Sequence, residues 1–148
     1  GILEVGGGLT GNRVVKFTGA NGTEQTINIT VAQASTGLGS ASGNAVTFTL
    51  TSSDQGNPLI VAQMLASAVN ALFGAGGTTV KAAADTNTVI FKEMTGGTAG
   101  NDANNGDFDV SAGGNIGQHT AFTGGAAANS DLDTTLLEFG VQMVDPKC

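Results

Sequence analysis

The chain has 148 residues, enough for one ordinary domain with a hydrophobic core and too few for two independent domains. Its formal net charge of −7 argues against partners bound through phosphates, namely nucleic acids and anionic membrane surfaces. Trp and Tyr are absent and His occurs once, so most side chains used for acid–base catalysis or for stacking on sugars and bases are missing. We therefore expect a folded chain that binds neither nucleic acid nor a membrane.

The first clear elements are two strands joined by a turn. β-Branched residues fill 13–18, and in 24–31 isoleucine and valine alternate with polar residues. Asn21 and Gly22 lie between the two segments, and Asn-Gly is the pair that tolerates positive φ at both corners of a tight hairpin turn. The pattern predicts an antiparallel hairpin.

A loop and a third strand are expected next. Residues 34–44 are rich in Ser and Gly and hold too few large apolar residues for an element, so we expect a mobile loop there. In 45–51 apolar and polar residues alternate without a fault, which places Val46, Phe48 and Leu50 on one face of a strand.

One segment has the period of a helix, at 58–73. Asn57 is placed to cap its start, Pro58 takes the first helical position, and Gly74 stands just past its end. Apolar residues recur at spacings of three and four, which predicts an amphipathic helix lying on a sheet. The residues expected to pack on that sheet are Val61, Leu65, Ala68 and Leu72.

The second half of the chain predicts more strands. Residues 79–82 and 88–92 flank the turn-forming residues 85–87 and so indicate a second hairpin. Further strands are expected at 108–110 and at 137–143, where every second residue is apolar.

These elements predict an α+β fold, mostly β, in which antiparallel strands and hairpins carry one amphipathic helix packed on the sheet. We expect a single domain over 1–148 with a flexible N-terminal arm, 1–11. Long Gly-rich loops are expected at 34–44, 96–106 and 112–130.

Few residues carry the chemistry of a catalytic or metal site. Asp102 and Asp107, with Asp109 nearby, form an acidic loop that offers oxygen ligands to calcium, although the spacing fits no EF-hand and solvated turn residues are the alternative. His119 has no partner in a recognisable arrangement, and Cys148, the only cysteine, can form no disulfide within the chain. We therefore expect neither enzyme activity nor a cofactor, and these aspartates are the candidate metal ligands.

The order of elements over 26–101 resembles that of small β-α-β modules in bacteriophage tail and head proteins and, more distantly, in flagellins and hook-associated proteins. The resemblance rests on the Ala-rich helix at 61–71, on the hairpin that follows it, and on Gly-Thr-Ala-Gly-Asn at 97–101. The long heptad helices with which flagellins build a filament core are missing, which favours a virion protein over a whole flagellin. The resemblance implies a structural role and supplies no catalytic residues.

Composition agrees with that role, because a surface rich in Thr, Asn and Gly can make repeated polar contacts through backbone and amide hydrogen bonds. The leading hypothesis is a structural protein of a bacteriophage particle, either a head decoration protein or a tail subunit, that assembles with itself and with other virion proteins. Two alternatives stay open. One is a domain of a flagellar or cell-surface filament, and the other is a calcium-dependent extracellular adhesion module.

The N-terminal arm and the loop 112–130 are the segments expected to contact other subunits. Their apolar residues are few or interrupted by glycines, whereas ordering each residue costs roughly 1–2 kcal/mol of backbone entropy. Both segments should therefore lie against neighbouring copies. The apolar anchors expected there are Ile2, Val5, Ile116 and Phe122.

Overall fold

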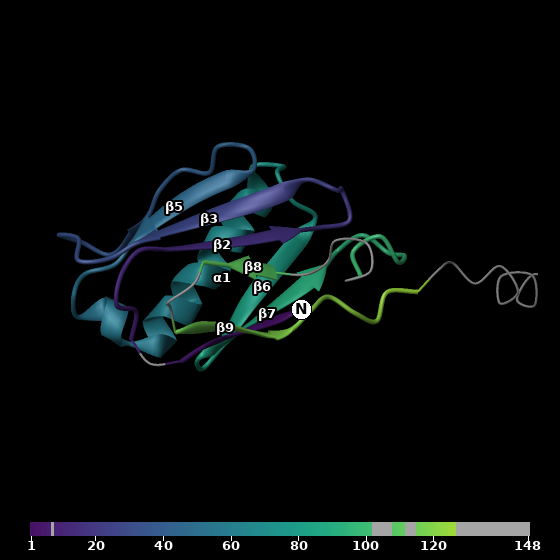
Figure 1. The fold of residues 1–148 in the computed structure, drawn as a ribbon. Coiled ribbons are helices and arrows are strands. Elements are labelled where there is room, and N and C mark those ends of the chain that lie inside the picture. The colour runs from purple at the N-terminus through teal and green to yellow at the C-terminus, as the bar shows by residue number, and fades with distance from the viewer. Residues whose placement is uncertain (7, 102–107, 112–114, 127–148) are drawn as a thin grey trace, which may run out of the picture.

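The computed structural model describes residues 1–6, 8–101, 108–111 and 115–126 (Figure 1). A short 3₁₀ turn, η1 (Asp54–Gly56), precedes the helix α1 (Pro58–Gly74). The strands are β1 (Ile2–Val5), β2 (Arg13–Thr18), β3 (Glu24–Thr30), β4 (Gly37–Leu38), β5 (Ala45–Thr49), β6 (Val80–Asp85), β7 (Thr88–Glu93), β8 (Phe108–Val110) and β9 (Ile116–Thr120). The expected α+β class, mostly β with one helix, is confirmed. The strand expected at 137–143 lies outside the described residues.

The strands form two sheets. The first has four strands in the order β6-β7-β1-β9, and the second has five in the order β4-β5-β3-β2-β8. Most neighbours are antiparallel, as expected, and β3 and β5 form a parallel pair within the second sheet. The physical reason is the long connection over 31–44, which gives the chain enough length to return to the start of β3 before β5 begins.

The first hairpin, β2 with β3, forms as predicted, but its turn differs in detail. The N–H of Gly22 donates to the carbonyl of Gly19 at 3.0 Å, which puts Ala20 and Asn21 at the corners of the turn. Gly22 follows them with a φ of +74°, whereas Asn21 keeps a negative φ. Glycine is therefore needed one position later than the tight Asn-Gly turn would require.

The helix closes one side of the two-sheet body (Figure 1). Asn57 caps its start by accepting a hydrogen bond from the N–H of Leu59 at 3.1 Å. α1 contacts β6 most extensively and also contacts β5 and β7, so it reaches strands of both sheets. The two sheets also meet where β8 lies beside β9. All four residues predicted to pack on the sheet, Val61, Leu65, Ala68 and Leu72, are fully buried.

The N-terminal segment is a central strand rather than a flexible arm. β1 pairs with β7 on one side and with β9 on the other, and its Leu3 and Val5 are fully buried in the core. The prediction failed because both ladder partners of β1 lie some 90 residues further along the chain or beyond, where local sequence patterns carry no information. The loops expected at 34–44 and 112–130 likewise contain the short strands β4 and β9.

Candidate functional site

The predicted assembly anchors occupy two different environments. Val5, Ile116 and Phe122 are buried in the core of the same chain, so the prediction that they contact neighbouring subunits is wrong. Val5 and Ile116 are buried because β1 and β9 pair with each other and direct alternate residues inward. Phe122 lies just after β9 and packs on the ring of Phe108. Ile2 is half-buried and lies on the opposite, outward side of β1.

The predicted metal ligands are not brought together in the described part of the chain. Asp102 and Asp107 lie outside the described residues, and Asp109 is exposed on β8, opposite Lys16 of β2. Among residues 1–6, 8–101, 108–111 and 115–126, no group of three His, Cys, Asp or Glu side chains is placed to hold a metal ion. His119 falls within β9, and Cys148 lies outside the described range.

Four phenylalanines from both sheets meet at one end of the core. The ring of Phe91 on β7 meets those of Phe17 on β2 and Phe108 on β8 edge-on, with centroid distances of 5.4 and 4.8 Å. Phe122, just after β9, stacks on Phe108 at 5.1 Å. Aromatic pairs in these geometries add to the stabilisation from burial alone, so this cluster joins the two sheets firmly.

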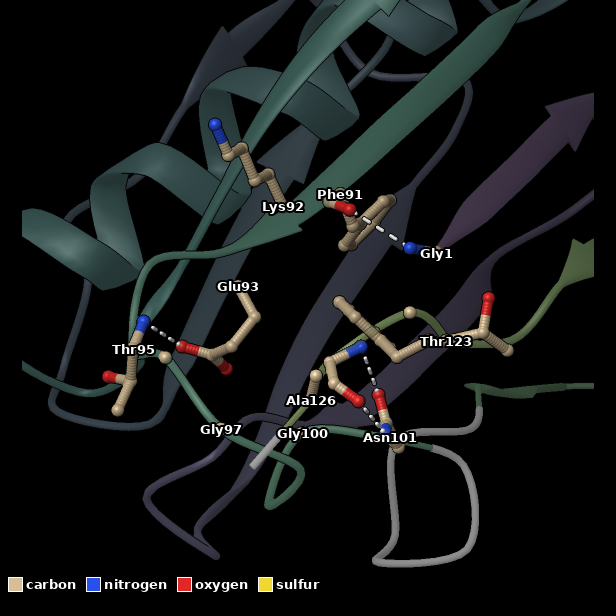
Figure 2. A pocket seen from close by; sticks show the side chains of 14 residues that line it. Gly1, Phe91, Lys92, Glu93, Thr95, Gly97, Gly100, Asn101, Thr123 and Ala126 are labelled. Carbon is tan, nitrogen blue, oxygen red and sulfur yellow. Dashed lines mark hydrogen bonds between the residues drawn. The ribbon is translucent and has the colours of Figure 1, made fainter. Parts of the chain in front are cut away.

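A pocket of about 350 Å³ opens beside this aromatic cluster (Figure 2). Phe91 and Phe122 contribute its apolar part, and its walls come from the Gly-rich segments 95–101 and 122–126. Asn101 joins the two walls, since its side-chain amide donates to the carbonyl of Gly125 at 2.9 Å and accepts from the N–H of Gly125 at 3.0 Å. Asn101 ends the Gly-Thr-Ala-Gly-Asn sequence, which therefore has a structural role here.

Among the described residues that line this pocket, Glu93 is the only one with a carboxylate side chain. One of its oxygens accepts from the N–H of Ala20 at 2.7 Å and the hydroxyl of Thr79 at 2.9 Å, and the other accepts from the N–H of Thr95 at 2.9 Å. Burial by itself raises the pKa of Glu93, but the hydrogen bonds from Thr95, Ala20 and Thr79 outweigh it and hold the pKa below its usual value. A carboxylate so placed stays ionised and ties three segments together, and it is poorly suited to act as a general acid.

Replacing Glu93 with glutamine should weaken the fold by about 1 kcal/mol at neutral pH, because a neutral amide oxygen accepts hydrogen bonds less strongly than a carboxylate does. The pKa of Glu93 is lower in the folded than in the unfolded chain, so its contribution is present above pH 4.5, the ordinary glutamate value, and is lost as the pH falls through the folded pKa. Urea unfolding at pH 7 and at pH 3 measures both effects.

The matched control is Glu24→Gln, since Glu24 is exposed and makes only a surface ion pair with Lys16 at 3.2 Å. The difference in stability between wild type and Glu93→Gln should shrink on going from pH 7 to pH 3, whereas the control should change little. A Glu93→Gln protein that keeps its full deficit at pH 3 would contradict the proposed role of the charge.

The first sheet turns one face to solvent, and this outward face is the second candidate site. Along β6, β7 and β1 the inward residues are buried or partly buried, while their neighbours alternate outward. Ile90 on β7 is 44% exposed, and register places it between Ala83 on β6 and Ile2 on β1. On these three strands the outward face consists of Ile2, Glu4, Lys81, Ala83, Asp85, Thr88, Ile90 and Lys92.

Sequence reasoning missed this face. The alternation in 80–85 and 88–93 and the turn between them contained enough information to pair Ala83 with Ile90, but the outward residues of that hairpin were not considered. The contribution of Ile2 had no local signal, because the pairing of β1 with β7 joins distant parts of the chain.

No protein-family model matches this chain, and neither a curated protein nor a solved structure matches it significantly. In the part of the chain that the structure describes, no helix is long and apolar enough to cross a membrane.

Proposed function

We propose that this chain is a structural subunit of a bacteriophage particle, a head decoration protein or a tail subunit, and that it acts by assembling with copies of itself. The observation that carries self-assembly is the row of aliphatic side chains, Ala83, Ile90 and Ile2, across three adjacent strands of the outward face. The phage assignment is supported by the resemblance of residues 26–101.

An aliphatic row in this position is unusual for a face exposed to water. A solvated face of a sheet normally carries polar side chains opposite the buried ones, whereas single exposed apolar residues need no explanation. Here the three apolar residues are neighbours on adjacent strands, and Ile90 leaves nearly half of its surface in water. Contact with another protein surface would bury this apolar area. Each Å² removed from water would stabilise the contact by about 25 cal/mol.

The pocket supports a structural role over catalysis. Its carboxylate, Glu93, already accepts hydrogen bonds on both oxygens, and most of its lining residues are glycine, threonine or alanine. Such a lining offers mainly shape and backbone hydrogen bonds.

The other functions stay separate hypotheses. Assembly through the outward face would equally serve a domain of a flagellar or cell-surface filament, so the location in a particle needs its own test. A calcium-dependent adhesion module would need ligands from the acidic loop, and of its aspartates the structure describes only the exposed Asp109.

Ile90→Asp should weaken self-association at least about 10-fold, because a carboxylate would have to be desolvated in the contact. The matched control is Leu59→Asp, since Leu59 is 46% exposed, almost the same as Ile90, but lies on α1 away from the first sheet's outward face. Sedimentation velocity over a range of concentrations measures association, and circular dichroism checks that each variant is folded. A wild-type chain that stays monomeric at millimolar concentration would refute self-assembly.

The particle assignment is tested with antibodies raised against the purified chain. Immunogold labelling should decorate heads or tails of phage particles released from the source culture in a regular pattern. Labelling of cell-surface filaments instead of particles would replace the phage proposal with the filament alternative.

A further inference from the structure

Charged and apolar side chains are segregated on the outward face of the first sheet. Three rows cross the strands in register, with a basic row at one end, an aliphatic row in the middle and an acidic row at the other end. The basic row is Lys81 opposite Lys92, the aliphatic row is Ala83, Ile90 and Ile2, and the acidic row is Asp85, Thr88 and Glu4. Because the rows are two residues apart along each strand, the basic and acidic rows are separated by about 13 Å.

The basic row is costly within a single chain. Like charges directly opposite each other on neighbouring strands are destabilising. Neither Lys81 nor Lys92 forms an ion pair with a described carboxylate, although the ammonium group of Lys81 lies 4.7 Å from the ring centroid of Phe73. Figure 2 shows Lys92 extending away from the pocket residues around it. These two lysines are two of the five basic residues in a chain of net charge −7.

On β6, β7 and β1 the charges of the outward face balance, since the two lysines match Glu4 and Asp85 in number. Two copies of this acidic chain can therefore bring these faces together without the repulsion that other parts of their surfaces would produce. Equal numbers of positive and negative charges do not by themselves fix how two copies are oriented. The separation of these charges into rows does fix the orientation.

Consider a two-fold axis that runs along the aliphatic row, in the plane between two copies packed face to face. The rotation keeps each aliphatic row opposite its own counterpart and exchanges the two ends of the face. The basic row of one copy then meets the acidic row of the other, at both ends of the contact. Such an isologous contact is self-complementary in charge and apolar at its centre, as closed dimers require.

We propose that the outward face binds the same face of a second copy of this chain through this two-fold contact, with Ile90 meeting Ile90 near the axis. The inference rests on the proposed function, because it names the surface and the orientation through which self-assembly begins. The contact stacks two sheets about 10 Å apart, the usual spacing of packed sheets.

Charge reversal tests the orientation. An all-acidic face is made by Lys81→Glu with Lys92→Glu, and an all-basic face by Glu4→Lys with Asp85→Lys. Each variant alone should self-associate at least about 100-fold more weakly than wild type, because like charges then meet at both ends of the contact. An equimolar mixture of the two should form a 1:1 heterodimer with an affinity within about 10-fold of the wild-type dimer, since opposite charges meet at both ends.

The control exchanges the charges of an ion pair on the second sheet, Lys16→Glu with Glu24→Lys, and should leave association unchanged. If one of the two double variants fails to fold by circular dichroism, the variant with all four charges of the face reversed carries the test, because its rows remain complementary and it should dimerise like wild type.

The outcomes separate this inference from the proposed function. Wild-type self-association that survives both double variants would overturn the two-fold contact while leaving self-assembly intact. A mixture that fails to form the heterodimer would overturn the contact as well. A monomeric wild type would overturn both proposals together.

Discussion

Replacing Phe91 with alanine should lower the free energy of unfolding by about 3–5 kcal/mol, the usual cost of removing a buried phenylalanine. Phe91 is buried, and its ring lies within 6.1 Å, centroid to centroid, of the rings of Phe17, Phe108 and Phe122. The truncation therefore removes contacts from both sheets at once and leaves a cavity between them. Urea denaturation followed by circular dichroism measures the loss.

The matched control is Phe73→Ala, because Phe73 is only partly buried at the end of α1. Phe73→Ala should lower the free energy of unfolding by about 1 kcal/mol, because it removes a partly buried ring and the contact of that ring with the ammonium group of Lys81. Equal losses for the two variants would mean that the aromatic cluster does not join the sheets as described.

Gly77→Ala should cost about 3 kcal/mol or more, because the new methyl group has no room. A Cβ at Gly77 would overlap the carbonyl oxygen of Gly43 and would lie 2.9 Å from the side-chain oxygen of Gln25. The carbonyl of Gly77 also accepts hydrogen bonds from the amide of Gln25 at 2.5 Å and from that of Asn21 at 2.9 Å. Moving the backbone to relieve the overlap would break these bonds and leave the fully buried Gln25 amide with only its longer hydrogen bond to the carbonyl of Thr23, at 3.3 Å.

Gly74→Ala is the control for this prediction. Gly74 is the last residue of α1, and a Cβ there would meet open space, so alanine should leave stability unchanged or raise it slightly. Thermal unfolding compares both variants with wild type. A Gly77→Ala protein as stable as Gly74→Ala would show that the segment around Gly43 can move aside freely.

β7 supplies residues to both candidate sites, and its alternation separates them except at Lys92, which also borders the pocket. Phe91 and Glu93 point inward to the core and the pocket, whereas Ile90 and Lys92 point to the outward face. Variants at Phe91 or Glu93 and variants at Ile90 therefore probe different properties, namely the stability of the fold and association between copies.

The elements that the sequence determined by itself are those specified by neighbouring residues. α1 was predictable because its signals lie within the helix or directly before it. These signals are the cap Asn57, Pro58 at the first position and the apolar period. The β2–β3 and β6–β7 hairpins were predictable because alternation and turn residues lie next to each other in the chain.

Only the tertiary structure decided where the short and glycine-interrupted segments lie. The sequence of β1 predicts an arm, because a segment of four residues with two inward apolar side chains is too short a signal for a strand. In the fold it is a strand because β7 and β9 provide hydrogen bonds on both of its sides. The same pairing buried Val5, Ile116 and Phe122 within the chain, and it placed Ile2 beside Ile90 on the outward face. Pairing between strands some 90 or more residues apart follows from the total burial and hydrogen bonding of the folded chain, which no local pattern of residues encodes.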